Sequence, residues 1–150
     1  MGRVIFAGAL LALVASGSAW ASDQDDVTAT VHSFIDAINR GDMAAAAATH
    51  VAAPSIIDEF APHHWTGPTA FADWAADFGK DSTANKITDS KLVPHNAKRL
   101  TVEADHAYVV MPTDYTFRQG TKTMIEYGSI TYALDKTTAG WRIAAWSYSW

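Results

Sequence analysis

The chain has 150 residues, a formal net charge of −5 and no cysteine. This length suits one domain with a single hydrophobic core, and the absence of cysteine excludes disulfides, thiol catalysis and cysteine-ligated metals. The acidic balance argues against nucleic acid as a partner, because no basic stripe is present to neutralise phosphates. Six Trp, five Tyr and six Phe favour an aromatic-lined pocket or interface.

Residues 1–21 have the form of a cleavable signal peptide. Arg3 precedes an uncharged apolar run over residues 4–15, and the small-x-small pattern Ala19-Trp20-Ala21 follows. The run is too short to cross a bilayer as an anchor. We therefore predict cleavage after Ala21 and a periplasmic or secreted domain, residues 22–150, with no membrane association after signal removal. A retained N-terminal anchor is the alternative.

Helical periodicity dominates the first half of the mature chain. Residues 23–40 are expected to form the first helix, in which apolar side chains recur at helical spacing and the start is acidic. Gly41 should end this helix, and Asp42 should cap a second, alanine-rich helix over residues 43–50 that Pro54 stops. The apolar residues of the first helix are Val27, Val31, Phe34, Ile35 and Ile38.

A third helix is expected from about Pro68 to Phe78, followed by a polar and mobile segment over residues 79–86. From Ile87 onward the apolar period changes from 3.6 to 2, which indicates strands. Tight turns are expected at Gly120-Thr121 and over residues 137–140, and Gly128 predicts a bulge inside a long strand. The predicted strands are 87–93, 107–112, 115–119, 123–135 and 141–150.

This order of elements predicts an α+β fold. Helices that precede a run of strands pack together on one face of the sheet. We expect a cone in which three N-terminal helices pack on a strongly curved antiparallel β-sheet. Such a cone encloses a cavity.

The stretch Ile56–Pro68 places carboxylates and histidines beside aromatic residues and turn formers. Ile56 and Ile57 read as a buried β-segment, and the residues after them read as an irregular connection. Connections on a rigid scaffold often carry binding and acid–base groups. This stretch is therefore the first place to look for a site.

Three motifs resemble the nuclear transport factor 2-like superfamily, which includes SnoaL-like and ketosteroid-isomerase-like proteins. The first is the helix end 34–42, which finishes in Gly-Asp, and the second is Ile57-Asp58-Glu59-Phe60 followed by Trp65-Thr66-Gly67. The third is the terminal pair 134–136 and 140–143 with aromatic residues after it. The resemblance covers nearly all of the mature chain and implies the cone-shaped fold.

The resemblance to the isomerases is partial at the residue level. Asp58 aligns with their general base, whereas Phe34 stands where they place an oxyanion-hole tyrosine. Near Ser129 and Ile130, where they keep a protonated aspartate, this chain has no acid. Without both donors an enolate would lose its main stabilisation. Steroid isomerisation by that mechanism is therefore disfavoured, while another acid–base reaction stays open.

Asp58, His63 and His64 are the candidate catalytic residues. An apolar surround would raise the pKa of Asp58 and make it a base, although a solvent-exposed turn carboxylate is the alternative. Glu59 should point away from Asp58 to the surface. His63 and His64 could shuttle protons near neutral pH. Because neighbouring histidines on an extended segment diverge, we expect no metal site. We also expect no cofactor.

Eight aromatic residues are the candidate ligand-binding residues. Trp65 and Trp74 could wall the pocket or belong to the core. Trp146, Tyr148 and Trp150 share one face of the last strand, which suits either a pocket wall or a dimer contact. The full set is Phe34, Phe60, Trp65, Trp74, Tyr108, Trp146, Tyr148 and Trp150. Further hydroxyl donors depend on a strand register that the sequence leaves open, and these are Tyr108, Tyr115, Tyr127 and Tyr132.

The sequence thus favours an exported, cofactor-free domain that binds a small apolar or aromatic molecule. Catalysis, if present, would be isomerase-like or lyase-like proton transfer by Asp58, with His63, His64 or a tyrosine as partner. The alternative is a non-catalytic dimerisation or protein-interaction module, and a homodimer is expected in either case. An accessory domain without activity is a third reading.

Overall fold

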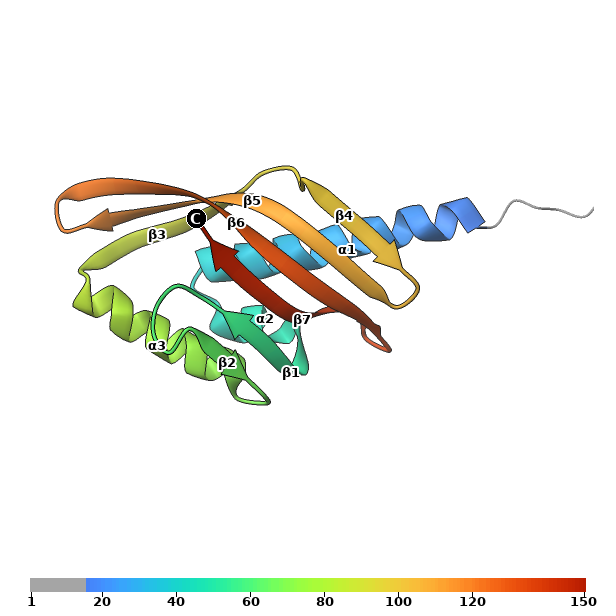
Figure 1. The fold of residues 1–150 in the computed structure, drawn as a ribbon, viewed down its shortest axis with the longest axis horizontal. Coiled ribbons are helices and arrows are strands. Elements are labelled where there is room, and N and C mark those ends of the chain that lie inside the picture. Colours follow the sequence, from blue (N-terminus) through green and yellow to red (C-terminus); the bar gives the residue numbers. More distant parts are fainter. Residues whose placement is uncertain (1–15) are drawn as a thin grey trace, which may run out of the picture.

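The computed structural model describes residues 16–150, and the side chains from Ser22 onward. The described chain forms three helices and seven strands (Figure 1). The helices are α1 (Ser16–Asn39), α2 (Met43–Ala48) and α3 (Ala70–Ala84). The strands are β1 (His50–Ile57), β2 (His64–Thr66), β3 (Ile87–Pro94), β4 (Arg99–Glu103), β5 (His106–Gln119), β6 (Lys122–Thr137) and β7 (Gly140–Ser149).

The strands form one curved sheet in the order β2-β1-β7-β6-β5-β3, and β4 also pairs with β5. Helix α1 lies against β3, β4 and β7, while α3 contacts β1, β2 and β3 (Figure 1). The predicted α+β fold, with three helices on a strongly curved sheet, is confirmed. The expectation of a wholly antiparallel sheet is wrong at one place, because β1 runs parallel to β7. Within residues 16–150, no helix is both long and apolar enough to span a bilayer.

The first helix confirms the periodicity in the sequence. Val27, Val31, Phe34 and Ile35 are fully buried, as their helical spacing predicts. Gly41 follows the helix with a φ of 71°, and the Asp42 side chain accepts a hydrogen bond from the Ala45 N–H at 2.9 Å. Both residues therefore have the capping roles expected of them. Most of the predicted signal peptide, residues 1–15, lies outside the described residues, and α1 begins within its remainder.

The third helix is longer than its apolar stripe indicates. It continues through Gly79 to Ala84, so the prediction of a mobile segment over residues 79–86 is wrong. Thr83 and Asn85 donate side-chain hydrogen bonds to the carbonyls of Gly79 and Asp81, which close the last turn. A surface helix needs only one apolar face, so this polar end remains helical.

Pro54 does not end the second helix, which already stops at Ala48. It lies buried in β1, where the pairing with β7 is interrupted between His50 and Ser55. A proline removes no ladder hydrogen bond at such an irregular position. The expectation for the buried β-segment is right for Ile56, which is fully buried, and wrong for Ile57, which is 52% exposed.

The strand-rich half contains fewer breaks than the sequence suggests. The predicted strands 107–112 and 115–119 form the single strand β5, and β6 pairs with it without interruption through Gly128. The bulge is in β7 instead, where Ala133 and Leu134 pair with Ala145 and Ile143. The short strands β2 and β4 were not predicted, and both turns around β6 are confirmed.

Gly128 is required by close packing. A Cβ atom built there would lie 2.7 Å from the carbonyl oxygen of Ser149 and 2.8 Å from the Tyr148 ring and hydroxyl. The Tyr148 side chain therefore passes over β6 at Gly128, the residue of that strand that has no side chain.

Strand register decides which tyrosines face the helices. Tyr132 pairs with Val109 on the inner face, and both are fully buried in the core. Tyr108 and Tyr127 project from the outer face and are 44% and 75% exposed. Tyr115 lies on the inner face, two positions beyond the buried Thr113.

Candidate functional site

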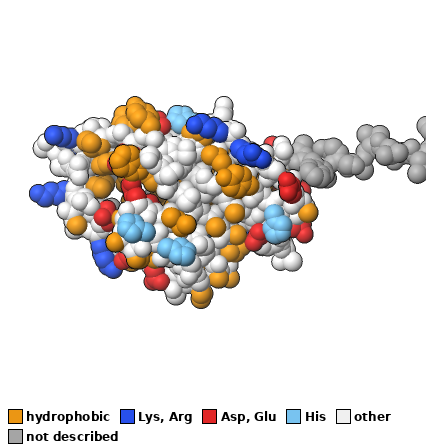
Figure 2. Space-filling view, viewed as in Figure 1, with side chains coloured by type: hydrophobic (Ala, Val, Ile, Leu, Met, Phe, Trp, Pro, Cys, Tyr) orange, Lys and Arg blue, Asp and Glu red, His pale blue; other side chains and the backbone are white. Residues whose placement is uncertain are grey.

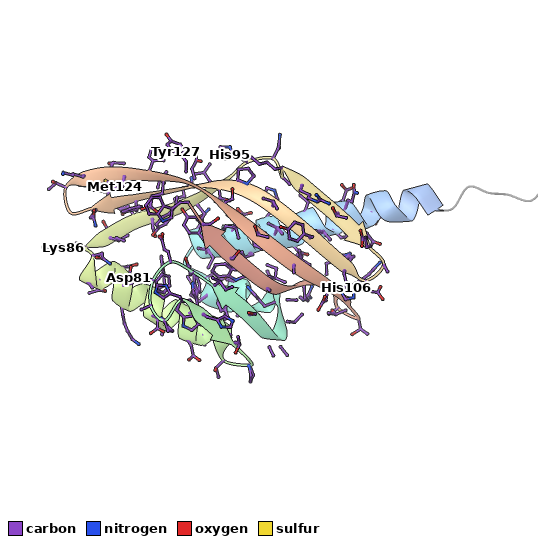
Figure 3. All side chains as sticks on the ribbon, in the orientation of Figure 1. Asp81, Lys86, His95, His106, Met124 and Tyr127 are labelled. Carbon is purple, nitrogen blue, oxygen red and sulfur yellow. The ribbon has the colours of Figure 1, made fainter. Side chains whose placement is uncertain are left out.

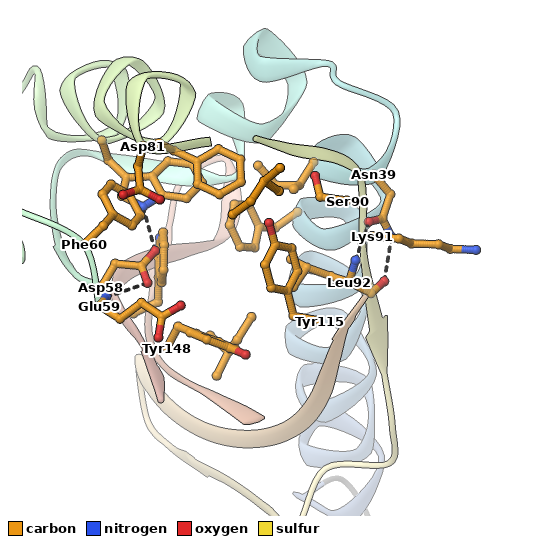
Figure 4. A pocket seen from close by; sticks show the side chains of 17 residues that line it. Asn39, Asp58, Glu59, Phe60, Asp81, Ser90, Lys91, Leu92, Tyr115 and Tyr148 are labelled. Carbon is orange, nitrogen blue, oxygen red and sulfur yellow. Dashed lines mark hydrogen bonds between the residues drawn. The ribbon is translucent and has the colours of Figure 1, made fainter. Parts of the chain in front are cut away.

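A cavity of about 80 Å³ lies between α1, α3, β3 and the inner face of the sheet (Figure 4). The connection after β1 contributes Asp58, Glu59 and Phe60 to its wall, and the C-terminal half of α3 contributes Asp81. Much of the remaining surface is aromatic. The aromatic lining residues are Phe34, Phe60, Trp74, Phe78, Tyr115, Trp146 and Tyr148.

Asp58 is the buried polar group of this cavity. It is 9% exposed, its Oδ2 accepts from the Trp74 indole N–H at 2.9 Å, and its Oδ1 accepts from the Glu59 N–H at 2.8 Å. Each oxygen keeps a lone pair for a further partner. The carboxyl group is therefore held in one orientation without being fully saturated.

The surroundings of Asp58 favour its neutral form. Burial is the main cause that raises the pKa of this carboxyl above its usual value, and the negative charges of Glu59 and Asp81 add to it. The hydrogen bonds from Trp74 and the Glu59 N–H act in the opposite direction. The balance moves the pKa of Asp58 toward neutrality, as in groups that exchange protons with a substrate.

The aromatic rings around Asp58 support one another. Trp74 stacks on Phe78 with ring centroids 5.6 Å apart and meets Trp146 edge-on at 5.1 Å. Trp146 donates its indole N–H to His50 Nε2 at 3.1 Å, and His50 Nδ1 donates to the Ala46 carbonyl at 3.0 Å. This chain of contacts fixes the ring planes that the cavity presents.

Two phenol groups face the cavity from the sheet. The hydroxyls of Tyr115 and Tyr148 are buried and form no hydrogen bond of normal geometry in the described chain. The Ser90 side chain lies near the Tyr115 hydroxyl and lowers its pKa, against the larger effect of burial. Burial raises the pKa of Tyr115 to about 12 and raises that of Tyr148 further, so both remain protonated. Each hydroxyl can therefore donate to, or accept from, a molecule in the cavity.

Asn39 holds the edge of the cavity closed. Its side-chain amide donates to the Leu92 carbonyl at 2.8 Å and its Oδ1 accepts the Leu92 N–H at 2.8 Å. The Asn39 amide thus forms the two hydrogen bonds with Leu92 that a neighbouring strand would otherwise form, and it connects the edge strand β3 to α1. The sequence shows Asn39 only as a residue at the end of a helix, so its role depends on tertiary structure.

The candidate partners His63 and His64 lie outside the cavity lining. His63 Nδ1 is 3.3 Å from the Asp58 carbonyl oxygen, and His64 Nε2 is 3.1 Å from Ser55 Oγ; both rings are exposed. The backbone of His63 has a φ of 72°, which turns its side chain away from the direction that an extended segment would give. Neither imidazole forms a hydrogen bond with the Asp58 carboxylate.

Five of the eight candidate ligand-binding residues line the cavity, and these are Phe34, Phe60, Trp74, Trp146 and Tyr148. Three do not. Trp65 is core and donates its indole N–H to Asp77 at 3.0 Å, and Tyr108 lies on the outer face. Trp150 is 75% exposed and donates to the Glu59 carboxylate at the cavity mouth.

Several lining residues were not singled out by sequence reasoning. Glu59 was expected at the surface only, yet it is both exposed and part of the cavity wall. Phe78 belongs to the predicted apolar stripe of α3, which was a usable signal. Asp81 sits at the α3 end of the wall (Figure 3) and lay in the segment expected to be mobile, so no signal pointed to it. The described residues contain no group of three or more His, Asp or Glu arranged to hold a metal ion.

Solved structures with this fold carry different activities in their names. A proposed aromatic ring hydroxylase from Novosphingobium aromaticivorans is 12% identical, with a TM-score of 0.71 over 87% of this chain and 90% of that one. A ketosteroid isomerase-like protein from Erwinia carotovora atroseptica is 18% identical, with a TM-score of 0.67 over 85% and 95%. A proposed dehydratase of the NTF2-like family from Streptomyces avermitilis is 16% identical, with a TM-score of 0.70 over 86% and 96%.

At these identities the likeness establishes the fold and leaves the reaction open. No curated protein matches the sequence. The family profile of the SnoaL-like domain matches residues 27–150, which is nearly all of the described chain. The chain therefore belongs to the SnoaL-like domain family, within the NTF2-like fold.

Proposed function

We propose that this domain binds a small, largely apolar molecule in the cavity, and that Asp58 exchanges a proton with it. The observation that carries the proposal is a buried carboxyl at an aromatic wall, oriented by Trp74 and lacking an ion-pair partner in the described chain. Apolar cavities with a few oriented polar groups are the usual form of a small-molecule site.

The proposed chemistry is proton abstraction or addition–elimination without a cofactor. A carboxyl group whose pKa is raised toward neutrality is an effective general base when ionised and general acid when protonated. The hydroxyl of Tyr115 lies on the wall opposite Asp58 (Figure 4) and can donate a hydrogen bond to the other end of the substrate. Tyr115 is thus a better-placed partner than His63 or His64.

Two of the structural neighbours agree with this reaction class. Isomerases and dehydratases both move protons, and proteins with those two names share the fold. The residues that stabilise charge must differ, since Phe34 occupies the position of the isomerase tyrosine. Tyr115 and Tyr148 supply hydroxyl donors from the sheet instead.

Binding is tested with 5-nitrobenzisoxazole, a neutral aromatic compound whose ring opening reports proton abstraction by a colour change. We expect it to quench tryptophan emission, because Trp74 and Trp146 line the cavity. We expect Asp58→Asn to retain quenching and to slow ring opening by roughly a hundredfold, the usual contribution of a general base.

Asp77→Asn is the matched control. Asp77 lies on α3, the helix that lines the cavity, and accepts an indole N–H from Trp65 at 3.0 Å, but it does not line the cavity itself. This variant should keep the wild-type rate. Equal rates for wild type and Asp58→Asn would refute the acid–base role, and an unchanged emission in all three proteins would refute the binding site.

A non-catalytic dimerisation module is the second candidate, favoured by apolar side chains on the outer face of the sheet. Tyr127 is 75% and Ile125 is 50% exposed, and Tyr108 projects from the same face. Figure 3 shows Tyr127 on the side of the sheet opposite α3. Light scattering of wild type and Tyr127→Ser tests this: a dimer that dissociates in the variant while quenching persists would support it.

We also propose export of the mature domain from Ser22. The signal-peptide pattern of residues 1–21 supports this, as does the retention of Asp23, which accepts from Lys136 at 2.7 Å and from Trp141 at 3.2 Å. N-terminal sequencing of the exported protein should begin at Ser22, and a start at Met1 would contradict the proposal.

On the face in Figure 2 the Lys and Arg side chains are dispersed rather than gathered in a stripe, consistent with a partner that is not nucleic acid.

A further inference from the structure

We propose that the ligand of this cavity is an organic cation, an ammonium group carried on an apolar or aromatic body. This rests on the proposed function that the cavity is a ligand site, and it names the class of molecule that the site takes. Its basis is the carboxylates, the aromatic rings and the unpaired oxygen atoms in and beside the cavity.

Among the described residues, the carboxylates of the cavity form no ion pair with a cationic side chain. Asp58, Glu59 and Asp81 line it, and Glu126 lies beside it on β6, directly across from Tyr115. The ion pairs among the described residues use other acids, namely Asp23, Asp77, Asp114 and Asp135. Lys91 also lines the cavity, but Figure 4 shows its side chain directed away from the space that the carboxylates surround.

These negative charges repel one another at short range. Glu59 and Asp81 add to the burial that raises the pKa of Asp58, and Glu59 adds to the burial that raises the pKa of Glu126. A cation in the cavity would relieve this repulsion and would favour the ionised form of Asp58. An anion in the cavity would be repelled by the same carboxylates.

The aromatic lining provides the second element of cation recognition. Ammonium ions bind over aromatic faces, most strongly over tryptophan, and rings grouped around a space form the aromatic cages that hold quaternary ammonium groups. Here Trp74, Trp146, Phe60 and Phe78 line the same cavity as Asp58, and Tyr115 and Tyr148 lie on the sheet side with centroids 6.4 Å apart. The rings also accommodate the apolar body of the ligand.

The unpaired polar atoms around the cavity are all able to accept hydrogen bonds. The Tyr115 and Tyr148 hydroxyls and Glu126 Oε2 are buried and form no hydrogen bond of normal geometry in the described chain. An ammonium N–H can satisfy such oxygens, and a carboxylate oxygen can be satisfied only by a donor. The absence of a metal-binding group in the described residues favours an organic cation over a metal ion.

The experiment compares three probes of nearly the same shape that differ in charge. Benzylammonium is the cation, ethylbenzene is the neutral isostere and phenylacetate is the anion, and calorimetry with tryptophan emission measures their affinities for the full mature chain. We expect the cation to bind roughly tenfold more tightly than the neutral compound, the scale of a desolvated cation–π contact, and the anion to bind most weakly.

The outcomes separate this inference from the function on which it rests. Equal or tighter binding of the neutral compound overturns the cation assignment and leaves the cavity as a ligand site. No binding of any probe overturns both. Binding of the cation that is lost in 1 M salt without a change in tryptophan emission would place it on the outer surface, which also overturns the inference.

Substitution locates the charge that matters. Asp58→Asn should weaken binding of the cation by roughly tenfold and leave the affinity of the neutral compound unchanged, because only the charge is removed. Glu59→Gln, at the exposed mouth, provides a second variant if Asp58→Asn does not fold, and should act in the same direction. Asp77→Asn is the control and should bind all three probes as wild type does. Equal effects of the substitution on cation and neutral compound would overturn the assignment.

Discussion

His50 predicts how the stability of the domain depends on pH. The ring is 8% exposed and lies 5.2 Å from the ring of Phe34 and 4.9 Å from that of Phe71. Its Nδ1 donates to the Ala46 carbonyl, and its Nε2 accepts the Trp146 indole N–H. A second proton on the ring would sit on Nε2 and turn it from an acceptor into a donor. This N–H would then face the indole N–H of Trp146 inside an aromatic core.

The sign and size of the effect follow from linkage. Burial lowers the pKa of His50 from 6.5 to about 4 in the folded protein. The unfolded chain therefore binds more protons between these two values, so the free energy of unfolding falls as the pH drops from 6.5 toward 4. One pKa unit corresponds to about 1.36 kcal/mol. The difference of about 2.5 in pKa therefore lowers the free energy of unfolding by about 3 kcal/mol in full, and most of this loss is reached by pH 4.5.

The assay is urea unfolding followed by tryptophan emission at pH 7.5 and pH 4.5. We compare wild type with His50→Gln, whose amide oxygen can still accept from Trp146 but cannot be protonated in this range. Wild type should lose about 2.5 kcal/mol more than this variant between the two pH values. His64→Gln, at an exposed ring, is the control and should follow wild type.

Asp58 acts with the opposite sign, because its folded pKa is raised. Its contribution to stability is present at low pH and is lost as the pH rises through that folded value. It is common to all three proteins and cancels in the comparison. A wild-type loss no larger than that of His50→Gln would refute the reasoning about the buried imidazole.

Two further predictions concern packing around the cavity. Gly128→Ala should lower the free energy of unfolding by about 1–3 kcal/mol, because its Cβ would meet the Ser149 carbonyl oxygen at 2.7 Å. Gly79→Ala should raise the free energy of unfolding by about 0.5–1 kcal/mol, because Gly79 lies inside α3 with open space around its Cβ position. Equal effects in urea unfolding would show that the close approach at Gly128 is absent. Asn39→Ala should cost about 2 kcal/mol, since it removes both hydrogen bonds to Leu92, and should speed amide exchange in β3. Unchanged exchange at Leu92 would mean that α1 does not hold this edge.

The sequence alone was sufficient for elements whose signals are local. The stripe of α1, the Gly41 and Asp42 caps and the two turns of the β5–β7 meander depend on residues a few positions apart. Short-range patterns of this kind predict where an element begins and which of its faces is buried. The change of apolar period along the chain predicted the order of the elements, and the family motifs singled out Asp58, which the structure places in the wall of the cavity.

The tertiary structure decided everything that depends on residues distant in the chain. The parallel pairing of β1 with β7, the direction of Tyr115 inward and Tyr108 outward, and the clamp of Asn39 on Leu92 arise between segments that no local pattern connects. A shift of one residue in strand register would reverse every inner and outer position. The tertiary structure also decided that His63, whose backbone is left-handed, and His64 do not line the cavity. The composition of the chain indicated an aromatic pocket, and only the packing of distant elements determined which rings and carboxylates surround it.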